Sequence, residues 1–232
     1  MTTTEPGTTP VEGGPARERV YAWLRDGIIS GALEGGRFLD EQWVSGVVGV
    51  SRTPVREAFH RLEAERFICL LPRKGAQVRT VTARELEEVY QSRRLIEGHA
   101  IAEVCAARAG APAEIAGWIE DMSRAGAERD WFAVSGFDRQ FHRAIVGAAG
   151  NTVLTELYDT LRSRQQRVTV RALEARPERL TIIDAEHRQL VAALDAADTD
   201  EALRILNQHL RPVSEVVSAL DRTESGTAPG SG

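Results

Sequence analysis

The chain has 232 residues, of which 42% are hydrophobic, 27% charged and 6% aromatic, and its formal net charge is −5. These values are typical of globular proteins and exclude disorder along the whole chain, while the length allows one large domain or two smaller ones. No apolar run approaches the about 18 residues that cross a bilayer, and the N-terminal segment lacks the basic start and apolar stretch of a secretory signal. We therefore expect a cytoplasmic protein without a membrane partner.

The two parts of the chain differ in charge. Residues 16–81 carry 11 basic and 8 acidic side chains, whereas residues 82–232 carry 18 basic and 24 acidic ones. A contact with a polyanion is therefore expected in the first part only. The Gly-, Ser-, Thr- and Pro-rich ends, residues 1–15 and 222–232, are predicted to be disordered tails.

Three short helices are predicted after the N-terminal tail. Apolar residues at i, i+3, i+4 and i+8 from Val20 to Ile28 form the stripe of an amphipathic helix. A second helix follows at about residues 40–47, and a third begins after a tight turn, with Thr53 as its N-cap and Pro54 as its first helical residue. Two helices joined by a tight turn are typical of a helix-turn-helix motif.

A β-hairpin is predicted directly after the third helix. Apolar strands over residues 67–71 and 76–81 flank the turn residues 72–75. Residues 16–81 are thus predicted to form a winged helix-turn-helix domain with a small β-hairpin wing.

From residue 82 to residue 221 the sequence predicts helices and no sheet. Thr82 and Glu85 have the spacing of a capping box at the start of the first of them. The expected architecture is an all-α six-helix bundle, and the fold as a whole is mainly α. The predicted helices are 82–109, 112–126, 131–147, 152–173, 178–196 and 199–220.

One face of the third predicted helix is basic. Arg52, Arg56 and His60 are spaced by four and line up opposite the apolar side. An arginine pair at the start of a helix can reach guanine edges and phosphates in the major groove, and Arg73 and Lys74 at the wing tip could hold the flanking DNA. The alternative is a solvent-exposed basic face without a partner.

The string VSRTPVREA, residues 50–58, followed by Leu62 and PRKGAQV at residues 72–78, closely resembles the winged helix-turn-helix of the GntR family of bacterial regulators. The resemblance implies binding to double-stranded DNA. The sequence departs from the family pattern at Gln42, where relatives often have another DNA-binding arginine, and at Arg66, where glycine is usual. Matched by position, Arg52 and Arg56 correspond to the family's DNA-contacting arginines. The full set of candidate DNA-binding residues is Arg52, Thr53, Arg56, Arg73, Lys74 and Gly75.

Four polar residues of the predicted bundle can converge on one interior point. Asp138 and His142 are four apart, so both project from one face of a helix. His187 and His209 are each 11 residues from Asp198, the centre of the turn between two helices. At about 1.5 Å rise per residue both lie about 16 Å from that turn, level with each other. One carboxylate and three imidazoles suit Zn²⁺, with Ni²⁺ or Mn²⁺ as alternatives, although the four residues could also form a metal-free polar core cluster.

The bundle also resembles the FCD ligand-binding domain of the FadR subfamily of GntR regulators. The matching positions are Arg94-x-x-Glu97, Asp138-x-x-x-His142, Gly150-Asn151, Glu186-His187-Arg188 and His209-Leu210. This resemblance implies that Asp138, His142, His187 and His209 are the metal ligands. Six predicted helices are similar to the VanR-type branch of this domain.

Arg94 is the candidate effector-binding residue. A divalent ion with vacant coordination positions can bind a carboxylate, and Arg94 could hold the same group through two hydrogen bonds. The alternative for Arg94 is a salt bridge within its own helix to Glu97 or Glu87.

The sequence thus predicts a homodimeric transcription factor, a repressor in the usual mode of this family. Its first domain would bind a palindromic operator, and its bundle would bind a small carboxylate effector beside a divalent metal ion. One alternative is a metal-dependent hydrolase or lyase that uses the Asp/His₃ site to activate water. Another is an architectural DNA-binding protein that responds to no ligand, which leaves the histidine set unexplained.

Overall fold

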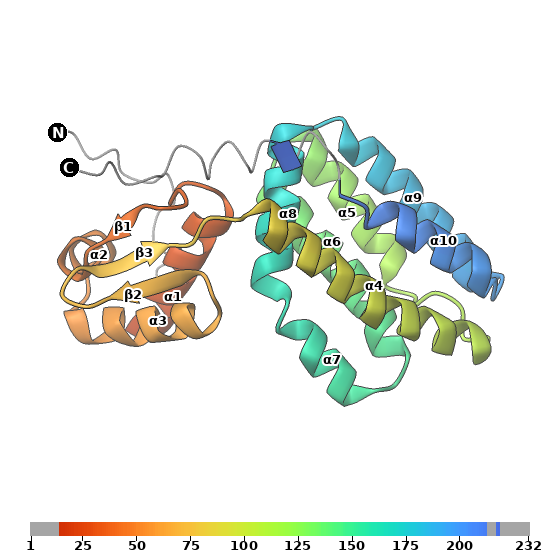
Figure 1. The fold of residues 1–232 in the computed structure, drawn as a ribbon, viewed down its shortest axis with the longest axis horizontal. Coiled ribbons are helices and arrows are strands. Elements are labelled where there is room, and N and C mark those ends of the chain that lie inside the picture. The colour runs from red at the N-terminus through yellow and green to blue at the C-terminus, as the bar shows by residue number, and fades with distance from the viewer. Residues whose placement is uncertain (1–13, 213–216, 219–232) are drawn as a thin grey trace. The chain divides into compact units, whose positions relative to one another are not determined.

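The computed structural model describes residues 14–212 and 217–218 (Figure 1). Its contacts divide the chain into two compact units, the first ending at Val81 and the second beginning at Thr82. None of the helices in the described part is long and apolar enough to cross a membrane.

The first unit combines three helices with a small antiparallel sheet, which confirms the predicted winged helix-turn-helix fold. Its core lies between the helices and the sheet, where Leu24, Val44, Phe59 and Ile68 are almost fully buried. The elements are α1 (Ala16–Ile29), β1 (Phe38–Leu39), α2 (Glu41–Val48), α3 (Arg52–Ala64), β2 (Ile68–Leu71) and β3 (Gly75–Val78).

The start of α3 differs from the prediction. The helix begins at Arg52 with Ser51 in the N-cap position, so Thr53, the predicted N-cap, lies inside the first turn. Pro54 is still compatible with the helix because N–H groups of the first turn have no helical partner to lose.

The sheet contains a strand that the sequence did not predict, because the two residues of β1 are too few to show a periodicity. Phe38 of β1 lies opposite Gln77 of β3, and β3 also pairs with β2, so the strand order is β1-β3-β2. Gly75 begins β3 with a φ of 87°, and a Cβ at this position would overlap the carbonyl oxygen of Leu39. Only glycine lets the wing approach the segment that leads into α2.

The second unit is entirely helical in its described part. Thr82, Asp130, Asn151 and Asp198 each cap a helix by accepting a hydrogen bond from a backbone N–H in its first turn. The helices are α4 (Ala83–Ala106), α5 (Ile115–Ala127), α6 (Trp131–Ala148), α7 (Thr152–Asp159), α8 (Arg162–Ala175), α9 (Arg179–Asp195) and α10 (Thr199–His209).

The described bundle has seven helices where the sequence predicts six. The segment predicted as one helix over residues 152–173 breaks at Thr160 and Leu161, whose N–H groups bond to carbonyls three residues back at 3.1 and 3.0 Å. Such tightened bonds interrupt the regular helix, and α7 and α8 run in different directions (Figure 1). The helix count therefore no longer argues for the VanR-type branch.

Helix α10 ends before the end of the predicted helix 199–220. α10 ends at His209, whereas the sequence predicts a helix up to Leu220. Pro212 has no N–H to donate and disfavours the helical conformation of the residue before it, which favours a break in the helix here. Of the rest of the predicted helix, residues 217–218 are helical, and residues 213–216 and 219–220 lie outside the described residues. The predicted tails, residues 1–15 and 222–232, lie outside the described residues except for residues 14 and 15.

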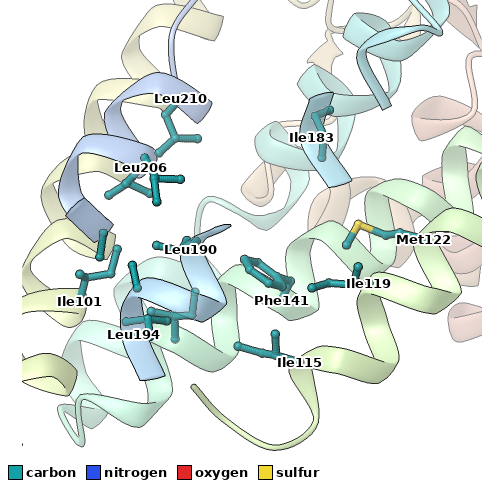
Figure 2. Close-up of a cluster of buried hydrophobic side chains, with 14 of the residues drawn as sticks. Ile101, Ile115, Ile119, Met122, Phe141, Ile183, Leu190, Leu194, Leu206 and Leu210 are labelled. Atoms are coloured by element: carbon teal, nitrogen blue, oxygen red, sulfur yellow. The ribbon is translucent and has the colours of Figure 1, made fainter. Parts of the chain in front are cut away.

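Apolar side chains from α4, α5, α6, α9 and α10 meet in one core cluster (Figure 2). Phe141 of α6 is fully buried there, and its ring stacks on the imidazole of His187 with centroids 4.1 Å apart. The next residue along α6, His142, is also fully buried. The packed core thereby fixes the helix faces that carry the polar residues described next.

Candidate functional site

The structure brings together the four residues predicted to share an interior site. Asp138 and His142 come from α6, His187 from α9 and His209 from α10, and all four are buried. One potential ligand atom from each lies within 4.8 Å of the others. His142 Nε2 is 3.1 Å from His209 Nε2 and 3.2 Å from His187 Nε2, and Asp138 Oδ1 is 3.6 Å from the Nε2 atoms of both His142 and His187. These residues could hold a metal ion.

Two of the three imidazoles are oriented by a carboxylate on the side away from the cluster. His209 Nδ1 lies 3.0 Å from Glu186 Oε2, and His142 Nδ1 lies 2.8 Å from Glu97 Oε2. A carboxylate behind an imidazole fixes its tautomer so that the opposite nitrogen is a free electron-pair donor. His187 differs, since its buried Nδ1 has no hydrogen-bond partner among the described residues.

The charges around the cluster favour an ionised carboxylate and mainly neutral imidazoles. Burial opposes ionisation of Asp138, but His142 and Arg93 outweigh it and hold its pKa well below the usual range. Burial lowers the pKa of both His187 and His209. Burial has the same effect on His142, but Glu97 and Asp138 outweigh it and raise its pKa. Neutral imidazole and ionised carboxylate are the forms that bind a divalent ion.

Four imidazole and carboxylate donors at this separation fit an ion such as Zn²⁺. Without an ion, Nε2 of His142 lies at hydrogen-bond distance from Nε2 of both His187 and His209, and only one proton can satisfy each pair. The unpartnered buried nitrogen of His187 adds a further cost of burial that a metal–nitrogen bond on the other side of the ring would offset.

Arg93 lines the cavity beside the cluster, whereas the sequence predicts its neighbour Arg94 as the effector-binding residue. Arg94 donates to the backbone carbonyl of Leu210 and does not line the cavity beside the cluster. Arg93 is only 2% exposed, and its Nε donates to Glu97 Oε1 at 2.6 Å. One terminal nitrogen of Arg93 is buried without a hydrogen-bond partner in the described chain.

A helical wheel could have distinguished the two arginines, because Arg93 continues the inward stripe that begins at Leu86 and Val89, whereas Arg94 is turned by about 100°. Glu97, predicted from the sequence as an alternative partner of Arg94, pairs with Arg93. Glu97 accepts from Arg93 and from the hydroxyl of Tyr158, at 2.6 and 2.7 Å. Burial raises the pKa of Glu97, but Arg93 and His142 outweigh burial and lower this pKa to about 2.

The cavity beside the cluster is small. It has a volume of about 20 Å³, which is room for about one water molecule. A larger ligand therefore requires a movement of at least one of its walls. The residues that line it are Tyr90, Arg93, Asp138, Thr169, Ala172, Arg179, Ile183, His209 and Leu210.

The predicted DNA-binding residues lie at a second place, on the surface of the first unit. Arg52, Thr53 and Arg56 are exposed on α3, and Arg73 and Lys74 are exposed at the tip of the β2–β3 wing. One groove of about 700 Å³ is lined by Arg52, Arg56, Arg73, Lys74 and Gly75, together with residues at the start of α2. The groove is about the size of a binding site and also contains acidic side chains from Asp40 and Glu41.

Comparisons with known proteins agree with this architecture. Residues 16–78 match the family described as bacterial regulatory proteins, gntR family, and residues 88–212 match the FCD domain. The chain is 28% identical over 218 residues to the gluconate operon transcriptional repressor of Bacillus licheniformis, which covers 91% of this chain and 89% of the relative. It is 26% identical over 201 residues to the HTH-type transcriptional repressor GlaR of Escherichia coli, covering 82% and 90%. The solved structure of E. coli McbR/YncC has the same fold, with a TM-score of 0.70 and 24% identity over 91% of this chain and all of that one.

Proposed function

Because the chain belongs to the GntR family of bacterial regulatory proteins and contains an FCD domain, we propose that it is a transcriptional repressor controlled by a metal-bound effector. Residues 16–81 form the operator-binding domain and residues 82–221 the effector domain. The observation that carries the proposal is the buried cluster of one carboxylate and three imidazoles in the domain that does not contain the DNA-binding residues. The family consists of regulators, so the hydrolase or lyase alternative is not retained.

Operator binding depends on the basic surface of α3 and the wing. Arg52, Thr53 and Arg56 face the major groove, while Arg73, Lys74 and Gly75 approach the flanking backbone. The exposure of the charged residues and their position on one groove support this assignment. An exposed arginine at the start of a recognition helix is the side chain best suited to read guanine.

The ligands of the proposed ion are Asp138, His142, His187 and His209. We propose Zn²⁺ on the basis of the nitrogen-rich donor set, with Ni²⁺ or Mn²⁺ as alternatives. When bound, the ion supplies a positive centre that can accept a carboxylate oxygen. The protein's own contribution is to orient the imidazoles and to exclude water from the site.

The effector is a small carboxylate. Arg93 replaces Arg94 in our assignment, because Arg93 lines the cavity and has a buried nitrogen available for a second carboxylate oxygen. One relative is named for a gluconate operon, and gluconate is itself a small hydroxycarboxylate. Since the cavity holds about one water, effector entry must displace a wall, and this couples ligand binding to a change in the bundle.

The regulator acts as a homodimer on a palindromic operator. Three large apolar side chains are exposed on two helices that contact each other: Leu95 of α4 is 77% exposed, and Val153 and Leu157 of α7 are 64% and 55% exposed. Tyr158 of α7 donates to Glu97 of α4, and this buried hydrogen bond links the two helices. An exposed apolar surface of this kind supports pairing with a second copy.

The test uses the duplex upstream of the protein's own gene, with binding followed by fluorescence anisotropy. Arg52→Ala and Arg56→Ala are each expected to weaken binding by about 1–3 kcal/mol, whereas Arg84→Ala, which removes an exposed arginine from α4, is the control and should leave it unchanged. With Zn²⁺ present, gluconate and a panel of other mono-, di- and tricarboxylates are then added. Release of the DNA by one of them supports the proposal, and unchanged affinity of both arginine variants would contradict it.

A further inference from the structure

Both arginines on the exposed face of α3 are held by side chains from the preceding helix. Arg56 Nε donates to the two carboxylate oxygens of Glu41 at 3.0 and 2.8 Å. Arg52 donates through a terminal nitrogen to Gln42 Oε1 at 3.0 Å. The pairs lie in the surface groove of the first unit, and Arg56 remains 62% exposed although it is paired.

The start of α2 is well fixed, so these two partners have defined positions. Asp40 accepts from the backbone N–H groups of Gln42 and Trp43 at 2.8 and 3.0 Å and thereby caps the turn that carries Glu41 and Gln42. Gly75 of the wing approaches the backbone carbonyl of Leu39 closely, which limits movement of this segment just before Asp40. A surface ion pair normally costs side-chain entropy to form, but a fixed partner reduces that cost for the arginine.

The geometry of the Arg56 pair leaves its DNA-reading end available. Glu41 occupies Nε, and the two terminal nitrogens of Arg56 have no hydrogen bond to any residue in the described ranges. Two parallel N–H groups at the tip of a guanidinium match O6 and N7 of guanine. The pair with Glu41 therefore orients Arg56 without using the atoms that would recognise a base.

We propose that Glu41 and Gln42 are positioning residues for sequence recognition, with Glu41 setting the guanine preference of Arg56 and Gln42 setting that of Arg52. The inference rests on the proposed function, since it requires that α3 enters the major groove of an operator. It also gives a role to Gln42, which stands where relatives often have an arginine.

The proposed role has an energetic signature that a simple charge effect would not produce. Glu41 places a negative charge on a DNA-facing surface, where it opposes binding to phosphates of any sequence. Removing the side chain is therefore expected to strengthen non-specific binding while it weakens the preference for guanine at one position. Affinity and specificity then change in opposite directions.

The experiment uses full-length protein and a library of duplexes with a randomised core of about 20 base pairs, enough for two half-sites one helical turn apart. Bound duplexes are sequenced, and affinity for a scrambled duplex is measured at several salt concentrations. The variants are Glu41→Ala, which removes the partner of Arg56, and Glu41→Gln, which removes the charge but keeps an oxygen that can accept from Nε. Glu57→Ala is the matched control, because Glu57 is an exposed acid on α3 with no ion pair in the described residues.

We expect Glu41→Ala to lower the guanine preference at one position of each half-site about tenfold and to bind the scrambled duplex about threefold more tightly, with a steeper salt dependence. Glu41→Gln should share the tighter non-specific binding but keep most of the guanine preference. Gln42→Ala should lower the preference at a different position. Glu57→Ala should leave the enriched motif unchanged.

A Glu41→Ala variant that enriches the wild-type motif with undiminished guanine preference would overturn the inference, because Glu41 would then act only as a charge. Failure of the wild-type protein to enrich any motif would instead overturn the proposed function. Circular dichroism of each variant checks that the first unit is folded before its motif is interpreted.

Discussion

His187 is the ligand whose removal tests the metal site most cleanly. Truncation of His142 or His209 would leave Glu97 or Glu186 buried without its imidazole partner, so loss of metal could not be separated from the cost of an unpaired carboxylate. The Nδ1 of His187 has no such partner in the described chain. His187→Ala therefore removes one ligand and one stacked ring and leaves no new unpaired charge.

The expected effect is a loss of stabilisation by the ion. An ion at about 100 times its Kd adds about 2.7 kcal/mol to the free energy of unfolding, which corresponds to about 5–11 °C in the midpoint of a protein of this size. The wild-type protein, stripped with a chelator and then reloaded with Zn²⁺, should show this shift. With three ligands left, His187→Ala should show little or none of it at the same concentration.

The assay is thermal unfolding followed by far-UV circular dichroism, with and without Zn²⁺. Shifts are compared within each variant, because loss of the ring stacked on Phe141 also lowers the midpoint of the metal-free protein. His99→Ala is the control, since His99 is an exposed histidine of α4 outside the cluster and should keep the full shift. Equal shifts in His187→Ala and wild type would refute the ligand assignment, and so would a wild-type protein that Zn²⁺ does not stabilise.

Three further outcomes are expected. Affinity for Zn²⁺, measured by calorimetric titration, should be lower at about pH 5.5 than at about pH 7.5. Glu97 and Asp138 raise the pKa of His142 above its ordinary value of about 6.5, so a proton competes with the ion at this ligand first. Equal affinities at the two pH values would contradict this expectation. Leu157→Glu should convert the dimer into a monomer, as measured by light scattering at micromolar concentration. A charge buried in an apolar interface without a partner costs too much free energy for the dimer to persist. A wild-type protein that is already monomeric would exclude the proposed dimer. Arg66→Gly should raise the free energy of unfolding, measured by chemical denaturation, by about 1 kcal/mol. Arg66 adopts a left-handed φ of 61°, which glycine adopts without strain. A lower free energy of unfolding would show that contacts of the arginine side chain contribute more stability than its backbone strain costs.

The sequence by itself determined the elements and the set of four polar residues. Helix stripes and turn residues are local signals, so the helix-turn-helix, the wing and most bundle helices could be predicted from spacing alone. The convergence of Asp138, His142, His187 and His209 could also be predicted. Four residues along a helix return to the same face, and equal distances from a turn bring two antiparallel helices into register.

Only the tertiary structure decided which other side chains surround these residues. Glu97, Glu186 and Arg93 reach the cluster from helices whose rotation is set by packing, and a rotation of about 100° separates Arg93 from Arg94. In the first unit, the pairing of Arg56 with Glu41 joins residues of two helices that no periodicity connects. Contacts of this kind depend on how faces pack across the core, and the spacing of residues along one chain does not contain that information.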